Sequence, residues 1–307
     1  MIFPDLTALP TRLGSARKAP CPHTRHRSNM MLNPLTLKHL NRIDDHPADA
    51  ITLNLEDAIA PARKKEALEN IALFLSHCPA STSRIIVRVN PLDAGGAEEI
   101  VYLNRFGFDA VRLSKVRTRD EIDRALALLD PDKELHLSIE TSEAFRDLAQ
   151  WRGIDRLTTV NLGILDLLAD LNLPQALLKP GHPTVDHILT TFLLRARIAG
   201  VIPVGFMFQD YADTERYTEW LEHLKYLGYD AAACMGPAQV AIANRVFGMH
   251  DGEAIARARH IVRVFEEHAL KNINGFMDDR YGFIDEPIYR DARNILKGIS
   301  DNIKEKL

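Results

Sequence analysis

Six charged side chains follow short apolar segments of this sequence, at the points where each segment gives way to a turn. They are Glu56 and Asp57 after AITLNL, Arg88 near the end of RIIVRVN, Lys115 after DAVRLS, Glu140 at the end of ELHLSIE, and Asp166 just beyond LTTVNL. Carboxylates bind hard cations, and guanidinium groups bind carboxylates. If the segments are parallel strands of a closed α/β barrel, their ends meet at one face and these side chains converge on one pocket. This pattern is typical of an active site.

Glu140 and Asp166 are the candidates for a metal site. Two carboxylates at the ends of adjacent strands can hold one Mg²⁺, which takes few protein oxygens and keeps room for substrate oxygens and water. The simpler alternative is that Glu140 caps a helix that starts near Thr141 and that Asp166 caps one that starts at Leu167. The occurrence of both carboxylates at successive strand ends favours the metal site, where Glu140 also contributes to substrate binding.

Arg88 is the candidate for binding a substrate carboxylate. Strand alternation directs its side chain into the upper end of the barrel. A guanidinium there can hold a carboxylate by two parallel hydrogen bonds. The alternative is a structural salt bridge to Glu56 or Asp57, and one arginine can fill both roles.

Glu56, Asp57 and Lys115 are candidates for supporting roles. The two acidic residues are predicted to support the arginine and the metal-bound waters, and both are candidates for proton transfer. The alternative is that they only shape the turn before Pro61. Lys115 is a candidate for neutralising an enolate or a phosphate of the substrate, and its alternative is an ordinary solvated lysine.

The segments that must position these residues alternate between short apolar runs and helical patterns. The predicted strands are SNMML, AITLNL, RIIVRVN, DAVRLS, ELHLSIE, LTTVNL, VIPVGFMF and YDAAACM, each followed by a helix. Such alternation predicts parallel strands, because each crossover needs a helix to cover the sheet. An open doubly wound sheet would normally have a glycine-rich phosphate turn after its first strand, and this chain has Asn33-Pro34 there. We therefore predict an α/β fold, a (β/α)₈ TIM barrel with a C-terminal helical extension.

Composition excludes several classes of protein. The chain has 307 residues, 46% of them hydrophobic, and a formal net charge of −4. The charge argues against nucleic acid as a partner, and no apolar run approaches the roughly 20 residues that a membrane span requires. The three cysteines are far apart and match no metal-ligand spacing. With no signal-peptide pattern at the N-terminus, these features predict reduced thiols and a cytoplasmic protein.

Three regions are expected along the chain. Residues 1–26 form a basic N-terminal arm, either flexible or folded over a neighbour, and residues 27–250 form the barrel. Residues 251–307 form an extension, with a long helix over about 252–271, a segment that contains Asp285, and a final helix. This extension exceeds what a barrel needs, so we expect it to contact a neighbouring subunit.

Several motifs resemble those of a known family. NLEDAIAPARKKEA is similar to the DLEDAVAPARK signature of the citrate lyase β-subunit-like branch of the HpcH/HpaI aldolase superfamily. VRVN, SKV, IETSEAF, LGILDLLADL, LGYDAAACMGPAQV and FIDEP follow in the family's order, so the resemblance covers about residues 27–300. The resemblance implies a (β/α)₈ barrel that assembles as a homotrimer or a multiple of it. It also implies cleavage or formation of a carbon–carbon bond beside a carboxylate or thioester.

The resemblance also assigns roles to residues. It implies that Glu140 and Asp166 bind Mg²⁺, that Arg88 holds the carboxylate of a hydroxy or keto acid, and that Asp285 acts in trans from a neighbouring subunit. The sequence departs from the family pattern at Asn54, where the family has aspartate, and at Ser114, where it has proline. MMLNP also replaces the LFVPG-like turn that helps to shape the coenzyme A side in relatives.

Taken together, the sequence predicts a Mg²⁺-dependent carbon–carbon lyase. Its substrate would be a 3-hydroxy-carboxylic acid or its coenzyme A thioester, of the citryl-, malyl- or citramalyl-CoA type. Arg88, Asp285, Glu56 and Asp57 are the predicted catalytic residues. Alternative functions on the same site are an acyl-CoA thioesterase, a Claisen-type synthase, or a non-catalytic protein that binds a keto acid.

Overall fold

The computed structural model describes residues 5–21, 25–248 and 252–303. The described residues form two compact units, a barrel unit that ends at Gly248 and a C-terminal unit described from Gly252 onward. The predicted boundary between residues 250 and 251 lies outside the described residues. Each unit is considered by itself below.

Eight parallel strands form the sheet of the barrel unit, in the order β7-β6-β5-β4-β3-β2-β1-β8. They are β1 (Ser28–Leu32), β2 (Ala50–Asn54), β3 (Arg84–Val89), β4 (Ala110–Leu113), β5 (Glu134–Ile139), β6 (Leu157–Leu162), β7 (Ile202–Val204) and β8 (Ala232–Cys234). The two edge strands meet through a parallel bridge between Gly205 and Ala232. This bridge closes the sheet, and the predicted (β/α)₈ barrel is confirmed.

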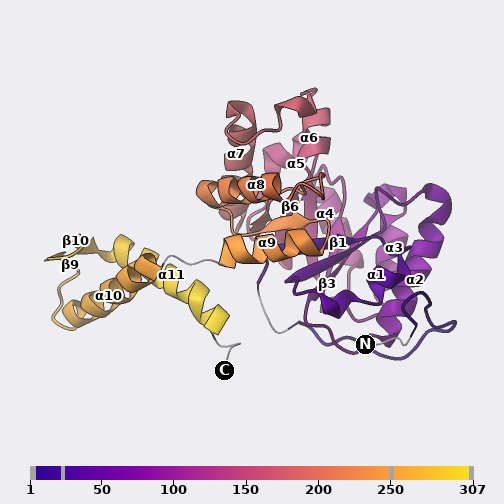
Figure 1. Ribbon diagram of the computed structural model, residues 1–307, viewed down its shortest axis with the longest axis horizontal. Coiled ribbons are helices and arrows are strands. Elements are labelled where there is room, and N and C mark those ends of the chain that lie inside the picture. The colour runs from indigo at the N-terminus through magenta and orange to yellow at the C-terminus, as the bar shows by residue number, and fades with distance from the viewer. Residues whose placement is uncertain (1–4, 22–24, 249–251, 304–307) are drawn as a thin grey trace. The chain divides into compact units, whose positions relative to one another are not determined.

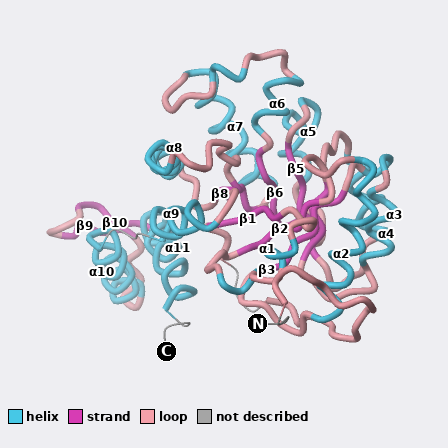
Figure 2. Tube along the Cα trace, turned by 45° about the vertical axis from the view of Figure 1, so that its right-hand side comes forward, coloured by secondary structure: helices cyan, strands magenta, loops and turns pink. Residues whose placement is uncertain are grey.

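Helices surround the strands, which occupy the centre of this unit (Figures 1 and 2). They are α1 (Leu37–Leu40), α2 (Lys64–His77), α3 (Gly96–Leu103), α4 (Arg119–Leu128), α5 (Ser142–Asp147), α6 (Ile164–Asp170), α7 (Pro183–Ala199), α8 (Thr214–Leu227) and α9 (Pro237–Gly248). Short 3₁₀ helices span Ile43–Asp45, Pro61–Arg63, Leu92–Ala94, Leu148–Trp151 and Gln175–Leu177. None of the described helices is both long and apolar enough to span a bilayer.

Strand alternation separates two kinds of side chain. Ile51, Leu53 and Val87 belong to the large apolar core that also includes residues of the helices. Ala50 and Ile86, on the opposite face of the same strands, belong to a small separate cluster. Farther along that face, towards the carboxyl ends of the strands, the residues become polar. The sequence thus builds an apolar layer under the helices and a polar upper interior.

Local signals fix several helices. Thr118 and Glu121 form a capping box at the start of α4, and Asp213 caps α8 by accepting a hydrogen bond from Arg216 N. The first helix is short, because α1 covers only Leu37–Leu40 and a separate 3₁₀ helix, Ile43–Asp45, follows it.

The N-terminal arm lies on the barrel of its own chain. The Nζ of Lys18 is 2.8 Å from Asp109 Oδ2, and both side chains are buried. Asp109 also accepts hydrogen bonds from the backbone N–H groups of Cys21 and Ile85, each over 2.7 Å. Because Asp109 directly precedes β4, the arm is anchored at the amino-terminal end of the barrel strands.

The C-terminal unit contains two helices and a hairpin. Helix α10 spans Gly252–Ala269 and α11 spans Glu286–Ile303. Between them, β9 (Gly275–Asp278) pairs antiparallel with β10 (Gly282–Asp285). The hairpin was not predicted, and the sequence signal for it is the DDRYG turn between two short apolar runs. Ile261 and Phe265 of α10 pack with Ile284 of the hairpin in a separate small core.

Candidate functional site

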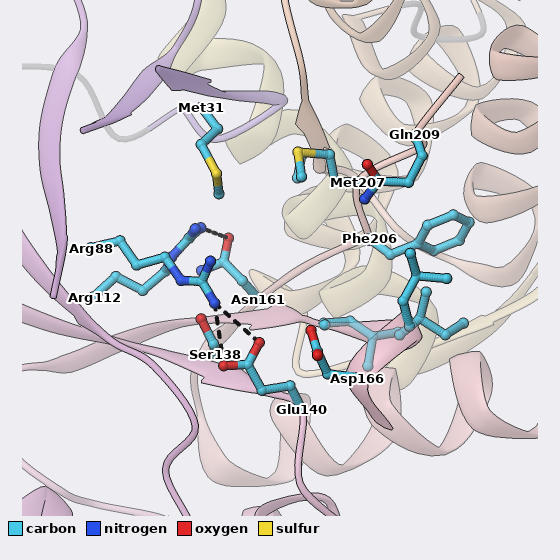
Figure 3. A pocket seen from close by; sticks show the side chains of 15 residues that line it. Met31, Arg88, Arg112, Ser138, Glu140, Asn161, Asp166, Phe206, Met207 and Gln209 are labelled. Carbon is cyan, nitrogen blue, oxygen red and sulfur yellow. Dashed lines mark hydrogen bonds and ion pairs between the residues drawn. The ribbon is translucent and has the colours of Figure 1, made fainter. Parts of the chain in front are cut away.

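A cavity of about 110 Å³ lies at the carboxyl ends of the barrel strands (Figure 3). Its lining includes the polar side chains of Arg88, Arg112, Ser138, Glu140, Asn161 and Asp166, and also Met31 of β1 and Phe206, Met207 and Gln209, which follow β7. The structure therefore brings Arg88, Glu140 and Asp166 together, as the sequence led us to expect.

Glu140 is buried and held in place by its neighbours. Its Oε1 accepts a hydrogen bond from the backbone N–H of Lys115 over 2.7 Å, and Lys115 has a left-handed φ of 49°. A Cβ on Gly163 would lie 2.6 Å from the Cβ of Glu140, so only glycine leaves room for this carboxylate. Thr141, rather than Glu140, caps α5. The interpretation of Glu140 as a helix cap is wrong, because its carboxylate turns towards the cavity.

Arg88 holds the carboxylates of two glutamates at once. Its Nη2 is 3.0 Å from Glu56 Oε2 and 3.2 Å from Glu140 Oε2. All three side chains are buried, and Arg88 Nε has no hydrogen-bond partner. Of the two acidic residues considered for a salt bridge, Glu56 is therefore the one that Arg88 contacts.

Lys115, Glu56 and Asp57 form a charged group beside the cavity. The Nζ of Lys115 is 2.9 Å from Glu56 Oε1 and 3.3 Å from Asp57 Oδ2. The Asp57 backbone N–H also donates to Glu56 Oε2. None of the three residues lines the cavity itself. Glu56 contacts Arg88, which does line the cavity, so the charged group is connected to the cavity through Arg88. This supports the expectation of a supporting role.

Burial and charge shift the pKa values of these three residues in different directions. Burial raises the pKa of Glu56, although the positive charges of Arg88 and Lys115 oppose the shift. Burial also acts to raise the pKa of Asp57, but hydrogen bonds from Glu56 and Lys115 outweigh it and the pKa is lowered. Burial acts to lower the pKa of Lys115, but its hydrogen bond to Glu56 and the charge of that carboxylate raise it.

Replacing Lys115 with Met should make the protein's stability more sensitive to pH. Without the ammonium, the pKa of Glu56 rises further, so folded Glu56 holds its proton more tightly than the unfolded chain does. That stabilisation is complete at low pH and is lost as the pH rises above the ordinary glutamate value of 4.5. We expect Lys115→Met to lose about 1 kcal/mol relative to wild type near pH 7, since the lysine is partly exposed. Urea unfolding between pH 4 and 8 measures this.

The control is Lys65→Met, because Lys65 is an exposed lysine of α2 that pairs with Glu69 over 3.9 Å. Its free energy of unfolding should follow the wild-type pH curve. A constant offset of Lys115→Met from wild type at every pH would contradict the predicted coupling to Glu56.

Asp166 lies in the first turn of α6, where Gly163 is the N-cap and no side chain caps the helix. The interpretation of Asp166 as a cap is therefore wrong as well. Its pKa is raised, first because nearby atoms restrict its hydration and second because Glu140 is close. The mutual repulsion of the two carboxylates favours a cation between them.

The residues present fit Mg²⁺ rather than a metal with a full protein ligand set. Among residues 5–21, 25–248 and 252–303, no group of three or more His, Cys, Asp or Glu could hold a metal ion. Glu140 and Asp166 instead supply two carboxylates on an accessible cavity. Mg²⁺ is usually held by one or two carboxylates and completes its shell with water and substrate oxygens.

Two buried polar residues of the site, Arg112 and Asn161, were missed by the sequence reasoning. Arg112 pairs in register with Arg88 across β3 and β4, and its Nη1 donates to Asn161 Oδ1 over 3.1 Å. Burial and the adjacent Arg88 lower the pKa of Arg112 to about 9. The available signal was the charged residue inside DAVRLS. Arg112 lies two residues before Ser114, the end of this segment, and strand alternation places both residues on the same face.

Asp285 belongs to the C-terminal unit. It ends β10, and its Oδ1 accepts a hydrogen bond from Ile288 N over 3.4 Å at the start of α11. Its catalytic role therefore stays a prediction.

A parallel (β/α)₈ barrel with two carboxylates and an arginine at the carboxyl ends of its strands defines a class of enzyme that acts on small carboxylic acids. The family described as HpcH/HpaI aldolase/citrate lyase matches residues 30–237. The chain belongs to this family, and the resemblance stated from its motifs is confirmed.

Named relatives fall within the same branch. A (3S)-malyl-CoA thioesterase of Cereibacter sphaeroides is 30% identical, with 72% of this chain and 76% of the relative covered. The citrate lyase subunit beta of Leuconostoc mesenteroides subsp. cremoris is 24% identical over 81% of this chain and 85% of its own. The Mycobacterium tuberculosis CitE crystal structure, a complex with magnesium, acetoacetate and coenzyme A, has a TM-score of 0.69 at 20% identity. It covers 88% of this chain and 96% of its own.

Proposed function

We propose that this protein is a Mg²⁺-dependent carbon–carbon lyase that cleaves a 3-hydroxy acid, or its coenzyme A thioester, to a keto acid. The observation that carries the proposal is the meeting of Glu140, Asp166 and Arg88 in one cavity at the carboxyl ends of the strands. Its family membership supports the same reaction class.

The roles of the residues follow from their chemistry. Glu140 and Asp166 would hold the metal, which when bound supplies positive charge where negative charge develops on the substrate oxygens. Arg88 orients the substrate carboxylate and holds Glu140 in place. Glu56 and Lys115 fix Arg88 from behind, and their ion pair keeps its guanidinium in one position.

The proton-transfer group is proposed to be Asp285 of a neighbouring subunit in a homotrimer. Glu56 and Asp57 do not line the cavity, so a direct transfer from either would require them to move. A carboxylate that reaches the cavity from another chain would meet the need of a retro-aldol cleavage for a general acid or base.

A second, larger cavity supports the thioester form of the substrate. It measures about 580 Å³ and lies beside β1, between apolar residues and the basic side chains of Lys38, His39, Arg42 and His46. Such a lining suits a ligand with an apolar arm and phosphates, as coenzyme A has. Met30 and Leu32 of β1 face this cavity, while Met31 faces the metal-binding cavity.

A thioesterase is the second candidate function, because (3S)-malyl-CoA thioesterases are among the relatives of this chain. Incubating the wild-type protein and Mg²⁺ with malyl-CoA or citramalyl-CoA separates the two. Release of a keto acid with an acyl-CoA product identifies a lyase, whereas release of free coenzyme A with the hydroxy acid identifies a thioesterase. Mg²⁺-dependent binding of a keto acid without turnover of any thioester would identify a binding protein instead.

Mixing two inactive variants should restore activity if Asp285 acts in trans. Asp285→Asn leaves the barrel site intact, and Glu140→Gln leaves the C-terminal unit intact. In a cyclic trimer of both chains, some sites combine an intact barrel with an intact neighbouring tail. Equal mixing should restore about a quarter of wild-type activity. About half of the sites have an intact barrel, and about half of those receive an intact Asp285 from the neighbouring chain. The two chains are co-expressed and co-purified, and the activity of the product is measured. Light scattering gives its mass and so shows whether it is a trimer.

The control pair is Glu140→Gln with Asp166→Asn, since both changes lie in the barrel and cannot complement each other. Asp285 has no part in trans catalysis if the first pair is as inactive as the control pair in a verified mixed trimer.

We also propose a cytoplasmic location. The three cysteines are all described, all buried, and form no disulfide. That state is the usual one in a reducing compartment.

A further inference from the structure

Arg112 is a buried cation whose charge no carboxylate of the described chain offsets through an ion pair. It lines the cavity and is 3% exposed. Its hydrogen bond goes to the neutral side chain of Asn161, and its Nε has no partner. Arg88, one strand away at the same register, pairs with both Glu56 and Glu140. Two adjacent arginines therefore differ in what neutralises them.

Asn161 adds a second unused donor beside Arg112. Its Oδ1 accepts from Arg112 and, over 3.3 Å, from Asn29 Nδ2, whose own Oδ1 accepts from Thr52 over 2.8 Å. Because a guanidinium can only donate, Asn161 must turn its oxygen towards Arg112 and its Nδ2 away from it. That Nδ2 is buried and has no partner. Arg112 and Asn161 both line the cavity (Figure 3), and each holds one buried donor without an acceptor.

Such an arrangement costs folding free energy. A buried charge without a partner, or a buried donor without an acceptor, loses its hydration and gains nothing in return. A bound anion would remove the cost, because a carboxylate accepts several hydrogen bonds and carries the opposite charge. The cavity walls are therefore complementary to an anionic group at Arg112, in addition to the one that Arg88 orients.

We propose that Arg112 and Asn161 bind a second free carboxylate of the substrate, so that the site favours acids that keep two free carboxylates, as a free dicarboxylic acid or a citryl thioester does, over acids that keep one. The inference rests on the proposed function, since it takes Glu140, Asp166 and Arg88 as the site for the first carboxylate. It assigns Arg112 to substrate binding and specificity.

L-malate and L-lactate are a matched pair of probes, because malate is lactate with one additional carboxylate and both are stable in solution. Dissociation constants are measured by calorimetry at saturating Mg²⁺ for wild type and for Arg112→Met. Wild type should bind malate at least about tenfold more tightly than lactate, on the scale of one charge-assisted hydrogen-bonding site. Arg112→Met should lose that preference while its affinity for lactate stays within about twofold of wild type.

Stability is the second readout, and it separates substrate binding from a structural role. Removing a buried cation without an ionic partner should leave the melting temperature of Arg112→Met equal to wild type or higher. Arg84→Met is the control, because Arg84 is also buried on β3 but does not line the cavity. Its Nη2 forms an ion pair with Glu134 Oε1 over 2.7 Å. Arg84→Met should lower the melting temperature and leave the preference for malate unchanged.

The outcomes are distinct. Equal losses of malate and lactate binding in Arg112→Met, or no loss of either, would overturn the role of Arg112. If Arg112→Met fails to fold, the unpaired-cation argument is wrong, and Arg112→Lys then tests the preference for malate directly. Lactate binding that needs neither Mg²⁺ nor Glu140, tested with Glu140→Gln, would instead contradict the proposed function.

Discussion

Replacing Glu140 with Gln, or Asp166 with Asn, is expected to abolish Mg²⁺-dependent turnover. Each change keeps the shape of the side chain and removes the charge that a hard cation needs. Mg²⁺ affinity should fall by more than about 100-fold, because losing even an outer partner of a metal ligand costs 10- to 100-fold. Calorimetric titration with Mg²⁺ and the rate of keto-acid release measure the two effects separately.

Two neighbouring carboxylates provide matched controls. Glu143 lies on α5 in an exposed ion pair with Arg117 over 2.7 Å, and Asp170 lies at the end of α6, where it accepts from Ser142 N over 2.7 Å. Glu143→Gln and Asp170→Asn should keep Mg²⁺ affinity and turnover near wild type. Full activity in Glu140→Gln or Asp166→Asn would sink the metal assignment.

Replacing Arg88 with Met should destabilise the fold as well as the site. Glu56 and Glu140 are 2% and 3% exposed, so removal of Arg88 leaves two buried carboxylates without their shared cation. Breaking a buried ion pair from one side costs about 3–5 kcal/mol. We expect a loss of that size in the free energy of unfolding near pH 7, together with loss of turnover. Urea denaturation and the keto-acid assay measure these effects.

Two further variants separate the causes. The double variant Arg88→Met with Glu56→Gln should recover part of the lost stability, because one of the two buried carboxylates that lost Arg88 is then neutral, but none of the activity. Arg88→Lys keeps the charge and loses the planar fork, so it should be more stable than Arg88→Met and still bind the substrate carboxylate poorly. A stability of Arg88→Met equal to wild type would show that this network contributes nothing to folding.

The barrel could be predicted from the sequence because its signals are local and repeat eight times. Each apolar run such as RIIVRVN is too short for a helix and is followed by a helical pattern, which restricts the fold to parallel strands. The hairpin of the C-terminal unit could not be predicted in the same way, because GFMD and GFID are only four residues long and one lies next to the final helix.

The site shows where local signals end. Glu140, Asp166 and Arg88 lie at or near strand ends, so their convergence follows from the fold alone. Glu56 and Asp57 do not line the cavity, and this depends on the direction of the loop after β2 and on Lys115. The Lys115 ammonium forms ion pairs with both carboxylates beside the cavity. The unpaired state of Arg112 is also beyond the sequence, because it depends on which carboxylates Arg88 has already taken.

The anchoring of the arm on Asp109 has a consequence for synthesis on the ribosome. Lys18 is made 91 residues before the carboxylate that it pairs with. At typical translation rates this separation corresponds to about 5–20 s. During that interval Asn41 and Ser76, which bond other residues of the arm, are already made, but the carboxylate that holds Lys18 is not. The part of the arm around Lys18 is therefore open to chaperones or proteases. Lys18 therefore reaches its place only after Asp109 has emerged, although it is made before every strand of the barrel.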